Sequence, residues 1–181
     1  DAGQHIPIAT LPGIRERTMT ISWGCKSFNS TGWKIGWACA PAALVNATLM
    51  AKQLFTFAGG SPFQPAIAAG LRLPDAYFAE LAGNLQSKRD LLSAALSAAD
   101  LQPITPEGTY FITCDIRHRR PDGDGMAFCR ALPTECGIVA IPASVLYSPE
   151  NEHEGRHLVR FAFCKQDATI KTAAEQLGNW A

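Results

Sequence analysis

The spacing of apolar residues near the start of the chain predicts two short strands followed by helices. Residues 17–22 are rich in β-branched side chains, and the apolar run 35–40 is closed by Pro41, so each is expected to form a strand. Residues 42–57 are apolar at most positions, which favours a largely buried helix ended by the glycines at 59 and 60. Together these elements are typical of a parallel α/β domain.

Helical periodicity is strongest after Pro74, a residue favoured at the first position of a helix. Apolar side chains recur there at helical intervals and are expected to form one stripe of a long amphipathic helix that ends near residue 100. The stripe consists of Phe78, Leu81, Leu85, Leu92 and Leu96. A shorter helix is expected before it, over residues 62–71.

Towards the C-terminal end, strands and helices alternate. Strands are expected over residues 109–116, 138–141 and 157–164, helices over 123–136 and from Asp167 onward, and a polar loop over 148–156. Along the strand 157–164, three apolar side chains alternate with a second set that contains Arg160. The apolar set is Val159, Phe161 and Phe163. Arg160 is therefore expected on the opposite face of this strand.

Composition indicates a globular protein without a charge bias. The 181 residues are 47% hydrophobic, and 16 Lys and Arg balance 16 Asp and Glu, which argues against nucleic acid or an anionic membrane as the main partner. The six cysteines form no Cys-x-x-Cys pair, so no zinc site or disulfide framework is indicated, and we expect reduced thiols in a cytoplasmic protein. No apolar run approaches membrane-spanning length. Because the chain begins with Asp1 instead of Met, we expect that a preceding segment has been removed or is not included.

The segment with the clearest chemistry is residues 22–37, SWGCKSFNSTGWKIGW, which places Lys26 among small and hydroxyl-bearing residues and Lys34 eight positions later. A lysine amine becomes a nucleophile when its surroundings lower its pKa, and Schiff-base formation with an aldehyde cofactor is a common use of that property. The alternative interpretation of Lys26 is an ordinary lysine in an exposed loop. The wider pattern favours the first interpretation.

Residues 25–37, CKSFNSTGWKIGW, resemble the lysine motif of the class I/II aminotransferases of fold type I, which depend on pyridoxal phosphate. The resemblance is strongest to the subgroup that contains kynurenine, methionine and N-succinyldiaminopimelate aminotransferases. Four further segments resemble this family in the same order, namely SPFQPAIA (61–68), PEGTYFI (106–112), GIVAIPASVL (137–146) and HLVRFAFCK (157–165). Chance does not keep five segments collinear, and together they extend over nearly the whole chain.

The resemblance implies a role for five residues. Lys26 is expected to carry pyridoxal 5'-phosphate as a Schiff base and to act as the catalytic base, and Lys34 to bind the cofactor phosphate, for which Ser22 is a further candidate. Arg160 is expected to bind the substrate α-carboxylate through two parallel hydrogen bonds. Phe57 matches a position that reaches the active site of the neighbouring subunit. The implied partners are an L-amino acid, a 2-oxo acid and a second copy of the chain in a homodimer.

Two positions depart from the family pattern. Family members have a serine three positions before the Schiff-base lysine, where it binds the phosphate, but Trp23 stands there in this chain. The residue just before the lysine, usually small and often glycine, is Cys25. Either Ser22 or Ser27 substitutes for the missing serine, or cofactor binding is weaker than in the family.

Several residues of the family's site are not among these 181, including the aspartate that pairs with the pyridine nitrogen and the glycine-rich phosphate loop. The expected fold is therefore α/β, the C-terminal part of a fold type I transferase. Residues 1–72 are expected to form the tail of the large cofactor-binding domain, and residues 73–181 the small α+β domain. The expected function is amino-group transfer that needs the missing N-terminal part of the enzyme. A carbon–sulfur β-lyase on the same fold and a non-catalytic truncated module stay open as alternatives.

Overall fold

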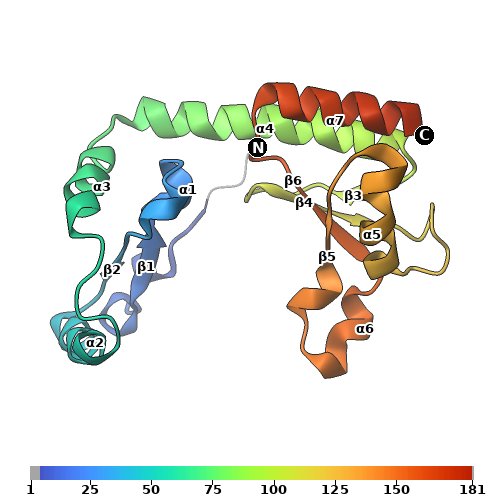
Figure 1. The fold of residues 1–181 in the computed structure, drawn as a ribbon. Helices are drawn as coiled ribbons and strands as arrows, with labels where there is room; N and C mark the ends of the chain where they lie inside the picture. Colours follow the sequence, from blue (N-terminus) through green and yellow to red (C-terminus); the bar gives the residue numbers. More distant parts are fainter. Residues whose placement is uncertain (1–4, 181) are drawn as a thin grey trace. The chain divides into compact units, whose positions relative to one another are not determined.

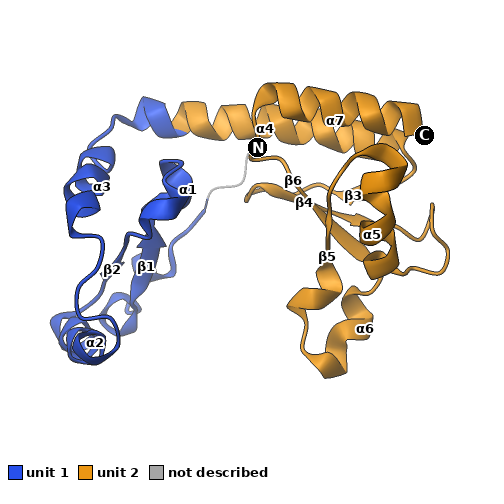
Figure 2. Cartoon of the chain, in the orientation of Figure 1, with its two compact units in different colours: residues 1–78 blue, residues 79–181 orange. Residues whose placement is uncertain are grey.

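The computed structural model describes residues 5–180, whose mixed α/β structure divides into unit 1 (residues 1–78) and unit 2 (residues 79–181; Figures 1 and 2). The long helix α4 (Asp75–Ala98) begins in unit 1 and ends in unit 2. The other elements of unit 1 are η1 (Ile8–Thr10), η2 (Arg15–Arg17), β1 (Thr20–Trp23), α1 (Gly24–Ser27), η3 (Thr31–Trp33), β2 (Gly36–Cys39), α2 (Ala42–Phe55), η4 (Ser61–Phe63) and α3 (Gln64–Gly70). Those of unit 2 are β3 (Gln102–Ile104), β4 (Phe111–Asp115), α5 (Gly125–Cys136), β5 (Ile141–Pro142), η5 (Ala143–Leu146), η6 (Pro149–Asn151), α6 (Glu152–Gly155), β6 (Leu158–Ala162) and α7 (Asp167–Trp180).

Strands β1 and β2 lie within three residues of the positions that the apolar pattern predicted. They pair antiparallel, with Thr20 opposite Cys39 and Trp23 opposite Gly36. The predicted parallel arrangement is therefore wrong for this pair. The connection between the two strands holds only the short turns α1 and η3, whereas a parallel crossover usually needs a full helix.

The helix predicted over residues 42–57 forms as α2, but its predicted burial is wrong. None of its residues is buried, and the side chains of Leu54 and Phe55 are 88% and 86% exposed. Apolar residues lie on nearly every side of this helix. The two four-residue strands of unit 1 present too little surface to cover more than one of those sides. The shorter helix predicted over 62–71 forms as η4 and α3.

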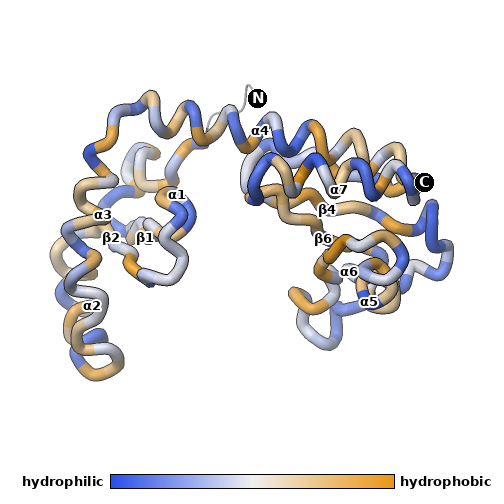
Figure 3. Tube along the Cα trace, turned by 45° about the horizontal axis from the view of Figure 1, so that its top comes forward, coloured by the Kyte–Doolittle hydropathy of each residue, from blue (hydrophilic) through white to orange (hydrophobic). Residues whose placement is uncertain are grey.

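In unit 2 the strands form one antiparallel sheet in the order β3-β4-β6-β5. The predicted alternation along β6 is confirmed, because Val159 and Phe161 are buried while Leu158, Arg160 and Ala162 on the other face are only half-buried. The buried face of the sheet packs in one core with helices α4, α5 and α7, which contribute the fully buried Leu96, Leu132 and Leu177. Figure 3 shows polar and apolar residues alternating along α4 and α7, as expected of helices with one buried face.

Three features of unit 2 differ from the sequence-based prediction. The strand predicted over 138–141 is reduced to Ile141–Pro142, because proline has no N–H to donate and so ends the ladder. The polar segment 148–156 forms the one-turn helices η6 and α6 instead of a loop, with Pro149 at the first turn of η6. Strand β3 was not predicted, because Pro103 lies at its centre. The structure accommodates this proline because β3 is an edge strand of the sheet.

All six cysteines are free thiols, and Cys25, Cys114 and Cys129 are buried. No helix within residues 5–180 has the length and apolar character needed to cross a membrane. In the same range, no group of three His, Cys, Asp or Glu side chains is placed to hold a metal ion.

The buried thiols should make unit 2 sensitive to alkali. Burial raises the pKa of Cys114 from its ordinary value of 9.0 to about 12. A thiol whose pKa is higher in the folded state stabilises the fold fully below its unfolded pKa, and this contribution is lost as the pH rises through the folded pKa. The free energy of unfolding, measured by urea titration, should fall as the pH is raised from about 8 to about 11. This fall should be about 2 to 3 kcal/mol smaller in Cys114→Ala than in the unsubstituted chain. Cys164→Ala, at an exposed position, should lose as much as the unsubstituted chain, and an equal loss in Cys114→Ala would contradict the prediction.

Candidate active site

Lys26 lies in the short helix α1, directly after β1, and its side chain is exposed. The position of α1 is fixed by Gly24, whose N–H donates to the Ile35 carbonyl at 3.1 Å and so extends the pairing of β1 with β2. A Cβ at Gly24 would lie 2.6 Å from Cδ1 of Ile67 in α3. The absence of a side chain therefore lets the turn that carries Lys26 pack closely against α3.

Hydroxyl groups hold the same turn by donating to its carbonyls. Ser30 Oγ donates to the Gly24 carbonyl at 3.3 Å, Thr31 Oγ1 to that of Cys25 at 3.4 Å, and the Tyr77 hydroxyl to that of Ser27 at 2.9 Å. The Cys25 side chain is 1% exposed, so it packs inward while the next residue, Lys26, is directed to the surface. This network explains the small and hydroxyl-bearing residues of the lysine segment, because they satisfy the carbonyls of a single-turn helix.

Lys34 stands just before β2 in the left-handed backbone conformation, with φ 55° and ψ 39°. Its Nζ lies 5.5 Å from the centre of the Trp23 ring, within the range of a cation–π contact. The described part of the chain supplies no hydrogen-bond acceptor or carboxylate to this ammonium group. Its charge is therefore left for a ligand or for solvent.

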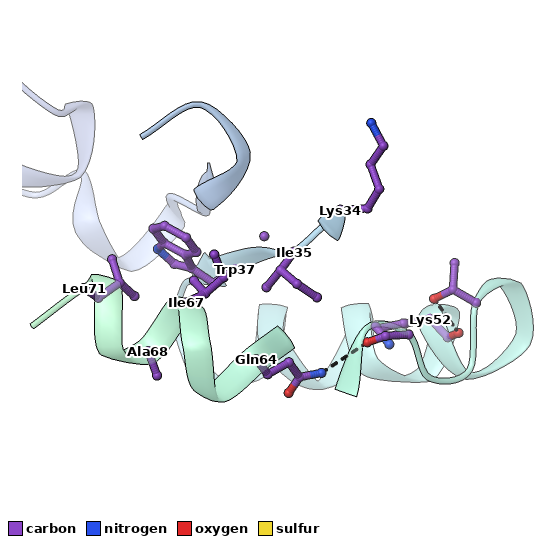
Figure 4. A pocket seen from close by; sticks show the side chains of 11 residues that line it. Lys34, Ile35, Trp37, Lys52, Gln64, Ile67, Ala68 and Leu71 are labelled. Carbon is purple, nitrogen blue, oxygen red and sulfur yellow. Dashed lines mark hydrogen bonds between the residues drawn. The ribbon is translucent and has the colours of Figure 1, made fainter. Parts of the chain in front are cut away.

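A pocket of about 600 Å³ lies beside Lys34, between β2, α3 and the end of α2 (Figure 4). Its apolar part is formed by Ile35, Trp37, Ile67, Ala68 and Leu71, and its polar part by Lys34, Lys52, Thr56 and Gln64. Figure 4 shows the Lys34 side chain pointing away from Gln64 and Ile67. The ammonium group of Lys34 is thus directed away from the pocket floor.

Ser22 and Phe57, the other two candidates of unit 1, occupy different surroundings. Ser22 is exposed and precedes Trp23 on β1, so the two side chains emerge from opposite faces of the strand. The Ser22 hydroxyl therefore does not share a face with the ring that Lys34 contacts. Phe57 is 77% exposed and has a left-handed backbone with φ 51°, and its carbonyl accepts a hydrogen bond from Lys52 Nζ at 3.0 Å.

Gly36→Ala should destabilise the strand pair on which Lys26 and Lys34 depend. A Cβ at position 36 would lie 2.8 Å from the Ser22 carbonyl oxygen, a backbone atom that cannot move without breaking the pairing of β1 and β2. We expect the free energy of unfolding to fall by about 1 to 3 kcal/mol, measured by denaturant titration. Gly32→Ala is the matched control, because nothing lies within 4 Å of its added Cβ. Equal stability of the two variants would contradict this interpretation.

Arg160, in unit 2, lies on the central strand β6, with Thr113 of β4 opposite on one side and Ile141 of β5 on the other. Its guanidinium carbon lies 4.0 Å from the centre of the Phe111 ring. Its Nε is buried and has no hydrogen-bond partner, and no acceptor for its terminal nitrogens is found within residues 5–180. A buried donor without a partner is costly, so its retention points to a function other than stability.

A second arginine of unit 2, Arg119, combines the same kind of ring contact with hydrogen bonds to backbone carbonyls. The Arg119 guanidinium also stacks on an aromatic ring, at 3.5 Å from the centre of Trp180. Its terminal nitrogens donate to the carbonyls of Ala99 at 3.1 Å and of Trp180 at 2.7 Å. Arg119 therefore joins the closing helix to the rest of the unit, whereas the guanidinium group of Arg160 donates no hydrogen bond within residues 5–180.

Two aromatic residues at the site were missed as functional candidates by sequence reasoning. From the sequence, Trp23 is only a departure from the family pattern, and residue type alone does not distinguish Phe111 from other aromatic residues of the expected strand 109–116. The structure places the ring of each against a predicted anion-binding side chain. In the case of Phe111, strand alternation carried a usable signal, because Phe111, Thr113 and Asp115 are the half-buried residues of β4, and Arg160 is one of those on β6.

Comparison with known proteins identifies the family. Residues 9–177 match the model of the class I and II aminotransferases, and this chain belongs to that family. It is 43% identical over 183 residues to a probable N-succinyldiaminopimelate aminotransferase of Mycobacterium tuberculosis, and 34% identical over 197 residues to the human kynurenine–oxoglutarate transaminase 1. These alignments include 98% and 99% of this chain but only 46% and 47% of the relatives.

Solved structures show the same relationship in three dimensions. The structure of N-succinyldiaminopimelate aminotransferase from Mycobacterium tuberculosis matches with a TM-score of 0.91 and 44% identity, over 100% of this chain and 46% of that one. YbdL from Escherichia coli, identified as having a methionine aminotransferase function, matches with a TM-score of 0.85 and 33% identity, over 97% of this chain and 45% of that one. The chain thus spans a little under half the length of the relatives and has the fold of that part of them.

Proposed function

We propose that this chain is the lysine-bearing part of a pyridoxal-phosphate-dependent aminotransferase, with Lys26 as the residue that binds the cofactor covalently. The observation that carries the proposal is the position of Lys26 in a family match over residues 9–177, exposed on a turn whose backbone is held by three hydroxyl groups. Because the chain spans 46% of its relative from Mycobacterium tuberculosis, we propose that activity also needs the remaining part of the family fold.

The residues present fit the cofactor and an amino acid substrate in two respects. Lys34 offers an ammonium group that has no acceptor among residues 5–180, which suits a phosphate dianion. Arg160 offers a guanidinium group for which the described part of the chain supplies no acceptor, which suits a carboxylate. Ser22 and Phe57 are exposed, which suits a contact of Ser22 with the phosphate and of Phe57 with a neighbouring subunit.

The chemistry divides between the cofactor and the chain. Pyridoxal phosphate, when bound, supplies the electron sink that stabilises negative charge at the substrate Cα. Lys26 Nζ takes the proton from the substrate Cα and returns a proton when the amino group is transferred. Lys34 holds the phosphate end, and Arg160 orients the substrate by binding its carboxylate. The expected products are the 2-oxo acid formed from the L-amino acid and the L-amino acid formed from the 2-oxo acid.

Amino transfer itself provides the test. The chain should be assayed with pyridoxal phosphate, 2-oxoglutarate and one of three amino donors suggested by the relatives, which are L-methionine, L-kynurenine and N-succinyldiaminopimelate. Glutamate formation is followed by mass spectrometry, first with the chain alone and then after adding the N-terminal portion of the Mycobacterium tuberculosis relative. We expect glutamate only in the combined sample. If a folded, combined sample forms no glutamate with any of the three donors, the proposal is contradicted.

A further inference from the structure

We infer that Trp23 is a positioning residue for Lys34, whose ammonium group it holds by an aromatic contact while leaving the N–H donors available to an anion. The inference rests on the proposed function, in which Lys34 binds the phosphate of the cofactor. It gives a role to the residue at which this chain departs most from the lysine motif of its family.

The first observation is the contact itself. Lys34 Nζ lies 5.5 Å from the centre of the Trp23 ring, and the part of the chain that the structure describes offers it no acceptor. A salt bridge would fix the ammonium group but would also neutralise it and occupy its donors. A ring face attracts the cation without neutralising it and without supplying a hydrogen-bond acceptor of the carboxylate kind, so N–H groups directed away from the ring stay available to a phosphate.

The second observation is the backbone of Lys34. A non-glycine residue with φ 55° is strained and is maintained only where neighbouring structure imposes it. Such conformations cluster at functional sites, and the lysine motif contains a second one, at Asn29 with φ 50°. The left-handed turn at Lys34 lies between η3 and β2, where the chain enters its pairing with the strand that bears Trp23.

The third observation is the residue opposite Trp23. Gly36 is its partner in the β1–β2 register, and a Cβ added there would lie 3.8 Å from Cδ1 of the indole. Glycine leaves the space beside the ring free of a side chain, so the Lys34 side chain can approach it. In Figure 4 the Lys34 side chain lies at the edge of the pocket that it helps to line and extends away from Gln64 and Ile67.

Titration with inorganic phosphate tests the inference without the cofactor. The amide resonances of Lys34 and Gly36 in the ¹⁵N-labelled chain are followed while phosphate replaces chloride at constant ionic strength. Trp23→Leu should weaken phosphate binding by about two- to fivefold, the loss expected from one exposed cation–π contact. Trp23→Phe keeps a ring and should bind within about twofold of the unsubstituted chain.

A nearby tryptophan provides the matched control. Trp33 stacks on Phe63 with ring centres 5.0 Å apart and has no cation contact among the described residues, so Trp33→Leu should leave phosphate binding unchanged. If Trp33→Leu weakens binding as much as Trp23→Leu, or if Trp23→Phe is as weak as Trp23→Leu, the positioning role is overturned.

A second measurement needs no variant, because a ring at this distance should shift the Lys34 side-chain methylene resonances upfield of those of Lys52. No such shift would also overturn the role.

Lys34→Ala separates the inference from the function on which it rests. Loss of the ammonium group should weaken phosphate binding by at least about tenfold. If Lys34→Ala binds phosphate as well as the unsubstituted chain, the proposed phosphate contact of Lys34 is wrong, and the role of Trp23 fails with it. If Lys34→Ala weakens binding and Trp23→Leu does not, the phosphate contact stands and only the inference about Trp23 is overturned.

Discussion

Lys26→Ala is expected to abolish covalent attachment of pyridoxal phosphate to this chain. Only a primary amine can form the Schiff base, and Lys26 is exposed on a turn held by hydrogen bonds from Ser30, Thr31 and Tyr77. The chain is incubated with the cofactor and reduced with borohydride, and the labelled peptides are identified by mass spectrometry. The unsubstituted chain should show one main label, at Lys26, together with visible absorbance of the bound cofactor.

Lys52→Ala is the control for unspecific labelling of lysines. Lys52 is exposed in the same unit, and its Nζ donates to the Phe57 carbonyl at 3.0 Å, a contact unrelated to the turn that carries Lys26. This variant should keep the label and the absorbance. Equal labelling of the Lys26→Ala variant would contradict the assignment. A folded but unlabelled unsubstituted chain would favour the non-catalytic module over the enzyme for the chain on its own.

Arg160→Met is expected to weaken carboxylate binding by at least about tenfold while changing the free energy of unfolding by less than about 1 kcal/mol. The charged hydrogen bonds to a carboxylate are lost, but no hydrogen bond within the described protein is lost with them. Methionine fills a similar volume against Phe111 and removes a buried donor that has no partner. Acetate titration of the ¹⁵N-labelled chain gives the affinity, and urea titration gives the stability.

Arg119→Met supplies the opposite pattern. Removing this guanidinium breaks two hydrogen bonds to the carbonyls of Ala99 and Trp180 and a ring contact, so it should cost about 2 to 4 kcal/mol of stability. Its effect on acetate affinity should be small as long as the chain is folded. If Arg160→Met destabilises the chain as much as Arg119→Met does, Arg160 is a structural residue and its proposed role in carboxylate binding is wrong.

The two proposed anion-binding side chains share one structural feature. Lys34 contacts the Trp23 ring, and Arg160 contacts the Phe111 ring, at 5.5 and 4.0 Å from the ring centres. Neither cation has an acceptor within residues 5–180. An aromatic ring restricts the motion of a long cationic side chain without neutralising it, which lowers the entropic cost when an anionic ligand binds.

Local sequence patterns were sufficient for most of the secondary structure. The period-2 alternation along 157–164 placed Arg160 on the half-buried face of β6, because strand geometry alone determines that placement. Pro74 and the apolar stripe that follows it located α4 within two residues. The prediction failed where neighbours decide, as in α2, whose apolar sequence indicated burial although the two short strands of unit 1 cannot cover it.

The sequence by itself determined the family and the residues that are candidates for its chemistry, because the lysine motif and four collinear segments depend only on residue order. Only the tertiary structure decided what surrounds those candidates. That Lys34 contacts Trp23, or that Arg160 contacts Phe111 while its Nε donates no hydrogen bond within the described residues, depends on strand register and side-chain direction. Register brings together residues far apart in the chain, and no local pattern specifies which ring meets which cation.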